Sequence, residues 1–289
     1  MGQTIRSRRL GADLRQLRRK ATLTADQVAE ELGFSQSKIS RIESGEVRVS
    51  RTDLKAMLAL YGVTDEAQVA AFVEAAKEAR TQGWWIAYED ALPREYRDFI
   101  GLEGQANSIR TFEGMIIPGL VQTPDYVRHI ITAGPAVLPP GHVDSLIKVR
   151  MERQTILERE HPPKLWIIVT EGAIRQEVGG CKVMIAQLQH LGQLTERSNI
   201  TLQVLPFSAG AHAGVQSSFV LFSFPENDPS IACVANLTGT LFMDQPGQLE
   251  AFSGAFDNLR ASALSPADSL TLIESVIKEL QAADRGRSS

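Results

Sequence analysis

The chain has 289 residues, of which 43% are hydrophobic and 22% charged, and a formal net charge of −4 at pH 7. This composition is typical of a globular protein with one large domain or two smaller ones. No run of about 18 apolar residues is present, so we expect neither a membrane span nor a signal peptide, and a cytoplasmic location. Cys181 and Cys233 lie far apart without metal-ligand spacing, so we expect two buried thiols, no zinc site and no cofactor.

Charge is distributed unevenly along the chain. Residues 1–55 contain 12 Lys and Arg against 7 Asp and Glu, whereas the remainder contains 18 against 27. A basic cluster of this kind either contacts nucleic acid or is a solvated helix face. Because phosphate repels an acidic surface, we expect only the N-terminal part to face DNA.

Residues 1–80 carry the signals of an all-α domain of about five helices. Thr24 and Gln27 have the spacing of a capping box, and Gly33 can end that helix in the left-handed conformation. Ser35 is a suitable N-cap for the next helix, so the two helices form a sharp helix–turn–helix. The other three helices are indicated by apolar repeats and caps at Leu10, Leu14 and Leu17, at Ser50, Asp53 and Leu54, and at Thr64, Val69 and Phe72.

The pattern changes after residue 80. We interpret 81–97 as a connector, 98–281 as a larger mixed α/β (α+β) domain with a mixed sheet, and 282–289 as a frayed tail. Strands are predicted at 108–117, 164–169, 200–205, 217–224 and 230–237. Helices are predicted near 124–132, 143–160, 171–178, 181–197, 246–262 and 266–281.

The second helix of the pair has an inward apolar side and an outward polar side. Ile39 and Ile42 point inward, and the outward residues are Gln36, Ser37, Lys38, Ser40 and Arg41. A major groove admits one α-helix, and these side-chain types read base edges or hold phosphates. Ser35, Gln36 and Ser37 at the start of this helix could also bind phosphate through free backbone N–H groups, and Thr24 is a further candidate DNA contact. The alternative is a surface helix hairpin without a ligand.

The stretch "TADQVAEELGFSQSKISRIESGEVRVSRTDLKAMLALYGV" resembles the XRE, or lambda-repressor-like, helix-turn-helix family over residues 8–63. The resemblance implies that Gln36, Ser37, Lys38 and Arg41 face the groove and that Ser40 lies near the DNA backbone. It leaves the cations of the first helix as additional phosphate contacts. Among these we favour Arg18 and Arg19 over Arg6.

The segments "FIGLEGQANSIRTFEGMIIPGLVQTPDYVRHII", "LWIIVTEGAIRQEVGG" and "ITLQVLPFSAGAHAG" resemble the regulatory domain of actinobacterial regulators of the WhiJ-like or Scr1-like type, over about residues 84–281. This resemblance implies a regulatory rather than catalytic domain. It also implies a small partner protein encoded nearby, in an antitoxin-like arrangement.

Motifs for enzyme chemistry are absent from the sequence: it has no GxGxxG, GxxxxGK[ST], HExxH or GxSxG. We therefore expect a protein that is not an enzyme. Glu103, Glu171 and Arg175 could converge near strand ends to bind a polar effector, or form an internal salt-bridge network. His212, in the glycine-flanked loop "SAGAHAG", is either in a ligand loop or in a structural turn.

The leading hypothesis is a transcriptional regulator that binds double-stranded DNA, forms a homodimer and responds to an effector or a small protein. One alternative is a module that sequesters a small partner, with DNA binding secondary. A second alternative is a sensor gated by a small molecule. No membrane partner is expected.

Overall fold

The computed structural model describes residues 5–78, 84–134, 139–225, 229–237 and 239–287. It separates into two compact units, Met1–Leu102 and Glu103–Ser289. The start of the expected connector, residues 81–83, and the last two residues of the expected tail lie outside the described residues, as does the side chain of Arg6.

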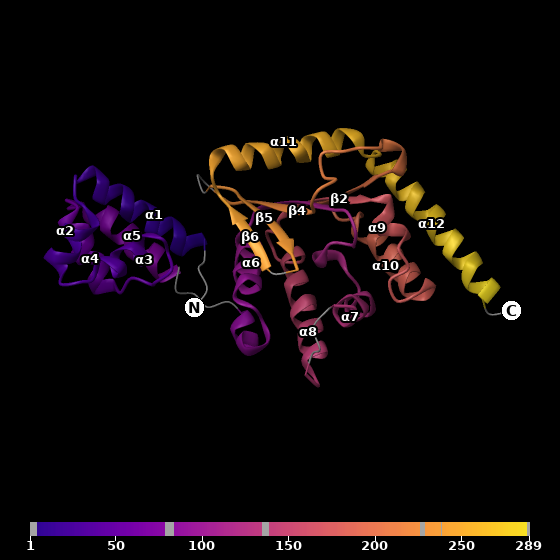
Figure 1. Ribbon diagram of the computed structural model, residues 1–289, viewed down its shortest axis with the longest axis horizontal. Helices are drawn as coiled ribbons and strands as arrows, with labels where there is room; N and C mark the ends of the chain where they lie inside the picture. The colour runs from indigo at the N-terminus through magenta and orange to yellow at the C-terminus, as the bar shows by residue number, and fades with distance from the viewer. Residues whose placement is uncertain (1–4, 79–83, 135–138, 226–228, 238, 288–289) are drawn as a thin grey trace. The chain divides into compact units, whose positions relative to one another are not determined.

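The described part of residues 5–78 forms the five expected helices (Figure 1): α1 (Ile5–Lys20), α2 (Ala25–Leu32), α3 (Gln36–Glu43), α4 (Arg51–Leu60) and α5 (Glu66–Glu78). We call this part the head. The local signals predicted for α2 and α3 are confirmed, whereas α5 is capped by Asp65 rather than Thr64. Thr24 and Gln27 complete a reciprocal capping box, Gly33 ends α2 with a φ of 65°, and the Ser35 hydroxyl accepts a hydrogen bond from the backbone of Lys38. The core of the head includes Leu14, Val28, Ile39, Leu54, Met57 and Leu58, all with no exposed surface.

Between the head and the sheet, the chain forms a 3-10 helix at Trp84–Ala91 and then α6 (Arg94–Gln105). The expected connector at 81–97 is therefore structured in its described part, and α6 was not predicted. Pro93 favours a loop in the sequence pattern, but proline is compatible with the start of a helix because the first N–H groups have no intrahelical acceptor.

The second unit contains a six-stranded sheet in the order β3-β2-β1-β4-β5-β6. The strands are β1 (Ser108–Glu113), β2 (Lys164–Thr170), β3 (Ile200–Leu205), β4 (Phe219–Ser223), β5 (Ile231–Asn236) and β6 (Gly239–Met243). β1, β2 and β3 are parallel, whereas β4, β5 and β6 each pair antiparallel to the preceding neighbour in the sheet. The predicted mixed sheet is confirmed, but β6 was not predicted.

The remaining helices are α7 (Pro124–Thr132), α8 (His142–Gln154), α9 (Glu171–Arg175), α10 (Cys181–Leu194), α11 (Pro246–Ser262) and α12 (Pro266–Arg287). α11 runs across one face of the sheet and α7 and α8 lie on the other (Figure 1). Phe256 and Leu259 of α11 pack against Phe112 and Ile168 of the sheet. The expected frayed tail is helical to Arg287, whose guanidinium pairs with Glu177 at 2.8 Å.

Both cysteines are buried free thiols, as predicted. In the described part of the chain, no cluster of three or more His, Cys, Asp or Glu side chains is arranged to hold a metal ion. No helix among the described residues has the length and apolarity that crossing a bilayer requires.

Candidate nucleic-acid interface

The outward side of α3 is polar and accessible. Ile39 and Ile42 point into the head core with 0% and 2% exposure, which turns the opposite side of the helix outward. We call this opposite side the reading face; it consists of Gln36, Ser37, Lys38, Ser40 and Arg41. All of these side chains except Lys38 are exposed, and Thr24 and Ser35 at the two helix starts are exposed as well. The structure thus brings the residues predicted on α3 onto one surface.

Members of the reading face differ in how far they are already engaged. The Gln36 side chain makes no hydrogen bond or ion pair with the described residues, and the Arg41 side chain makes one weak bond, from Nε to the Ser37 carbonyl at 3.3 Å. Lys38 is held more firmly: its Nζ lies 3.0 Å from Oδ2 of Asp53 and 3.4 Å from the centre of the Phe34 ring. Gln36 and Arg41 are therefore available to a ligand, whereas Lys38 must first leave Asp53.

Arg18, predicted as a phosphate contact, is part of the internal structure of the head. Its Nε and Nη2 donate to the two carboxylate oxygens of Glu43 at 2.6 and 2.9 Å, and Nη1 donates to the Leu23 carbonyl at 2.8 Å. The Arg18 side chain is only 11% exposed. The structure does not support Arg18 as a phosphate contact, because this bidentate pair uses its guanidinium to fix α1 against the end of α3.

The neighbouring hydroxyl of Tyr61 lies in the same buried environment. Burial, reinforced by the negative charge of Glu43, raises the pKa of Tyr61 to about 12, although Arg18 opposes this shift. Tyr61 therefore remains neutral at pH 7. The cationic neighbours of Glu43 are Arg18, at 2.6 Å, and the more exposed Arg15, whose Nε lies 4.0 Å from Oε2 of Glu43.

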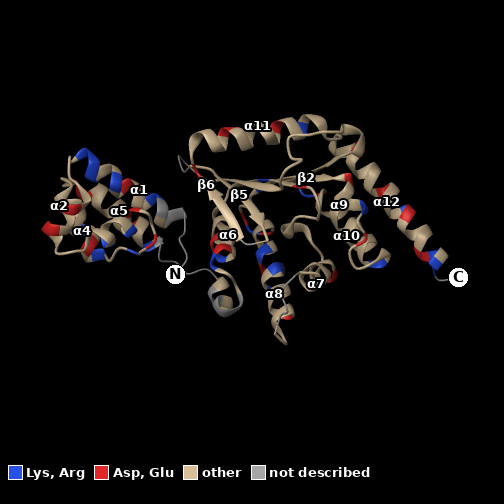
Figure 2. Ribbon diagram, in the orientation of Figure 1, with Lys and Arg blue, Asp and Glu red and all other residues tan. Residues whose placement is uncertain are grey.

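Exposed cations remain at the end of α1, whose last turn contains Arg18, Arg19 and Lys20. Figure 2 shows Lys and Arg along this helix. The side chains of Arg19 and Lys20 are exposed and make no hydrogen bond or ion pair with the described residues. Cations also stabilise a helix C-terminus without any ligand, so their position alone does not establish a phosphate contact.

Gly11, which the sequence analysis did not single out, determines how closely α1 approaches α3. A Cβ at this position would lie 2.6 Å from the carbonyl oxygens of both Ile42 and Glu43. Only glycine allows this backbone contact. An isolated glycine inside a helical pattern was the available signal, since such a residue destabilises a helix unless close packing requires it.

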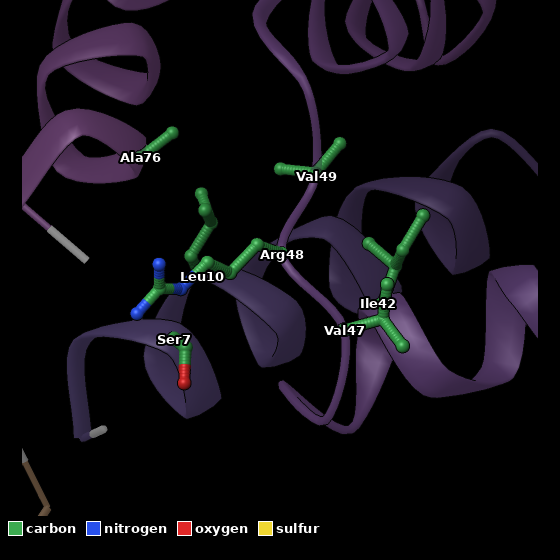
Figure 3. A pocket seen from close by; sticks show the side chains of 7 residues that line it. All are labelled: Ser7, Leu10, Ile42, Val47, Arg48, Val49 and Ala76. Atoms are coloured by element: carbon green, nitrogen blue, oxygen red, sulfur yellow. The ribbon is translucent and has the colours of Figure 1, made fainter. Parts of the chain in front are cut away.

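A small hollow lies beside this crossing (Figure 3). Its lining comes from α1, α3, the segment after α3, and α5: Ser7, Leu10, Ile42, Val47, Arg48, Val49 and Ala76. Most of these side chains are apolar and none belongs to the reading face. The hollow is thus a packing feature of the head, separate from the interface.

The three charged residues predicted to converge in the second unit do not all meet. Glu171 and Arg175 form a 2.7 Å ion pair, and Arg175 also pairs with Glu279 at 2.7 Å. Glu103 instead pairs with Arg153, with both side chains at most 5% exposed. These contacts match the internal salt-bridge alternative.

The side chain of His212 contacts its own loop and the sheet. Its Nδ1 accepts a hydrogen bond from the backbone N–H of Gly214 at 3.2 Å, within one turn of the loop. Its ring meets Phe112 edge-on, with centres 5.6 Å apart. The structure thus places His212 in a turn that packs on the sheet.

Comparison with known families agrees with this division of the chain. Residues 9–72 match a family model described as a helix-turn-helix domain, and residues 96–275 match one described as a domain of unknown function (DUF5753). The second match covers more than half of the chain. The chain belongs to the DUF5753 family. Among curated proteins and solved structures, no match was found.

The helix-turn-helix match contains α3 and its reading face, which indicates a DNA-binding regulator. The DUF5753 match contains the whole sheet and the buried Glu103–Arg153 pair. The head thus contains the matched helix-turn-helix domain, and the sheet belongs to the domain that defines the family.

Within the DUF5753 domain, Glu113 at the end of β1 is an unusual carboxyl group. Burial raises its pKa to about 7, although a hydrogen bond with Ser218 and the charge of Arg150 both lower it. Ser218 also accepts a hydrogen bond from the backbone of Gly114 at 3.0 Å. Ionisation of Glu113 therefore lowers the free energy of unfolding. The residue lies where the Gly114–Ser218 hydrogen bond joins the end of β1 to the start of β4.

We expect the unfolding free energy of this domain to depend on Glu113 in a defined pH range. The folded state binds the proton more tightly than the unfolded state, so stability falls as the pH rises from about 4.5 to above 7. Glu113→Gln should reduce this fall. Urea unfolding of both proteins at pH 5.5 and 8 measures it, and an equal fall in the variant would contradict the assignment.

Proposed function

We propose that the chain is a sequence-specific transcriptional regulator whose α3 enters the major groove of double-stranded DNA. The observation that carries this proposal is the pair Gln36 and Arg41, exposed and almost unengaged on the second helix of a helix-turn-helix. Gln can pair with adenine through two hydrogen bonds and Arg with guanine, so this pair suits base reading.

The surrounding residues are assigned roles by position. Ser37 and Ser40 accompany the reading residues, and the exposed starts of α2 and α3 at Thr24 and Ser35 offer backbone N–H groups to phosphate. Arg19 supplies a phosphate contact from α1. Lys38 joins when DNA phosphate replaces Asp53 as its partner.

Gln36→Ala and Arg41→Ala should each weaken specific binding by about 1–3 kcal/mol and relax discrimination at one base pair, because each removes a base contact. Arg19→Ala should weaken binding to all sequences and reduce the slope of log K against log salt by about 0.9. Fluorescence anisotropy on a selected site and on a scrambled site, at several salt concentrations, measures both effects.

Gln68→Ala is the matched control, because Gln68 is exposed on α5 away from the reading face. It should bind both DNAs like the wild type. Wild-type affinity and discrimination in both Gln36→Ala and Arg41→Ala would remove these residues from the reading role.

The DUF5753 domain is proposed to be regulatory rather than catalytic, and to form the dimer that brings two heads to two half-sites. A dimer of this kind reads half-sites spaced by about 34 Å or a multiple. A small protein encoded nearby, in the antitoxin-like arrangement of WhiJ-like or Scr1-like actinobacterial regulators, or a small-molecule effector would control it. A metabolite that acts as effector should raise the melting temperature of the protein.

Sequestration of a small protein partner is a second candidate function, supported by exposed apolar side chains. Met115 and Phe207 are 68% and 64% exposed, and Val215 is 70% exposed. The loops that carry Met115 and Phe207 are both bonded to the start of α9. The Thr170 hydroxyl donates to the Gly114 carbonyl at 2.7 Å, and the backbone N–H of Phe207 donates to the Glu171 carboxylate at 2.9 Å. A partner that co-purifies with the wild type at fixed stoichiometry, but not with Met115→Lys, would favour this function.

A further inference from the structure

The two edge strands of the sheet, β3 and β6, differ in whether another segment of the chain covers them. At the β3 edge, the backbone of Val204 is already satisfied: its N–H donates to the Ser269 hydroxyl and its carbonyl accepts from Leu264, both at 2.9 Å. The Gln203 side chain adds a 2.8 Å bond to the Leu264 carbonyl. The segment between α11 and α12, together with the first turn of α12, therefore closes this edge against further strands.

The opposite edge is formed by β6, which pairs with β5 and has no second strand neighbour in the described part of the chain. Alternate residues of an edge strand direct their N–H and C=O groups away from the sheet. Natural sheets usually protect such an edge with lysine, proline, a bulge or a covering segment. The sequence of β6, GTLFM, contains neither a charged residue nor proline.

Apolar side chains are concentrated at the same edge. Leu237, in the turn before β6, is 92% exposed, and Leu241, in the middle of β6, is 59% exposed. No charged residue occurs between 236 and 243, although residues 103–289 contain 19 Asp and Glu against 14 Lys and Arg. The β6 edge is thus a part of an acidic domain that a second copy can approach without charge repulsion.

We propose that β6 is the dimerisation element, and that it pairs antiparallel with β6 of a second copy to continue the sheet across both subunits. An antiparallel pair of identical strands is self-complementary about a two-fold axis, as a closed homodimer requires. An axis at the centre of β6 places Leu241 beside the partner's Leu241, where Cβ atoms are about 4.5–5.5 Å apart. This inference identifies the dimer surface. It rests on the proposed function in one respect, namely that the dimer serves to bring two heads to two DNA half-sites.

Charge substitutions at Leu241 test the pairing in the full chain. Leu241→Lys and Leu241→Glu each place like charges side by side at the axis, so each variant alone should be a monomer of 31.7 kDa. An equimolar mixture of the two should recover a dimer of twice that mass, because opposite charges then meet. Light scattering coupled to size-exclusion chromatography measures the masses, and thermal melting shows that each variant is folded.

Ala251→Lys is the matched control, because it adds the same charge at an exposed apolar side chain on α11, outside the β6 edge. It should remain a dimer. A monomeric wild type, dimeric single variants, or a mixture that stays monomeric would each overturn the proposal. DNA binding is measured separately on the dimeric wild type and its Gln36→Ala variant: equal discrimination by the two, with the mass results intact, would overturn the proposed function and leave the dimer surface standing.

Discussion

Arg153→Met is expected to destabilise the DUF5753 domain by about 3–5 kcal/mol, because it leaves the buried carboxylate of Glu103 without its cation. In the wild type, Nε and Nη2 of Arg153 donate to the two oxygens of Glu103 at 2.8 and 2.7 Å. The two side chains are 5% and 3% exposed, so water cannot replace the lost partner. The pair joins the last turn of α6 to α8.

Glu103→Leu combined with Arg153→Met should recover most of this loss, because two apolar side chains replace both charges at once. Urea unfolding followed by fluorescence in a Trp84→Phe, Trp85→Phe background, which leaves Trp166 of β2 as the remaining tryptophan, measures the domain that contains the pair. A single variant as stable as the wild type, or a double variant as unstable as the single one, would contradict the assignment of this pair as a buried unit.

Gly11→Ala is expected to destabilise the head by about 1–3 kcal/mol and to weaken DNA binding. The added methyl group would lie 2.6 Å from two backbone carbonyls at the end of α3, so α1 and α3 must separate. This movement also strains the Arg18–Glu43 pair, which joins the same two helices. The reading face then changes position although none of its residues is mutated.

Gly254→Ala provides the control for the intrinsic effect of the substitution. Gly254 lies in α11, and nothing lies within 4 Å of the position that a Cβ would occupy there, so alanine should stabilise the protein by about 0.5–1 kcal/mol. Hydrogen exchange of the α3 amides and DNA anisotropy measure the Gly11→Ala effect. Unchanged exchange and affinity in that variant would show that the crossing of α1 and α3 is less tight than the structure indicates.

Features encoded within a few residues could be predicted from the sequence. The capping box of α2, the left-handed Gly33 and the Ser35 cap all depend on neighbours three to four positions apart. They fix where α3 begins and, with buried Ile39 and Ile42, which of its sides faces outward. These local rules, together with the apolar character of Ile39 and Ile42, are sufficient to predict which side of α3 is the reading face.

Features that depend on distant pairs could not be predicted. Arg18 and Arg19 are adjacent and chemically identical, yet only Arg18 meets Glu43, 25 residues away. Charge alone groups Glu103 with Glu171 and Arg175, whereas the actual partner of Glu103 lies 50 residues along the chain. β6 could not be predicted because five residues after a turn give too short a pattern, and its pairing with β5 stabilises it.

The most direct test of DNA reading is the genome-wide recovery of fragments bound to the purified full-length protein. A variant with alanine at Gln36, Lys38 and Arg41 removes most of the reading face, and Gln68→Ala serves as the control. We expect the wild type and the control to enrich one short motif, and the triple variant to lose it. Absence of a motif, or its retention by the triple variant, would contradict the claim that α3 reads DNA.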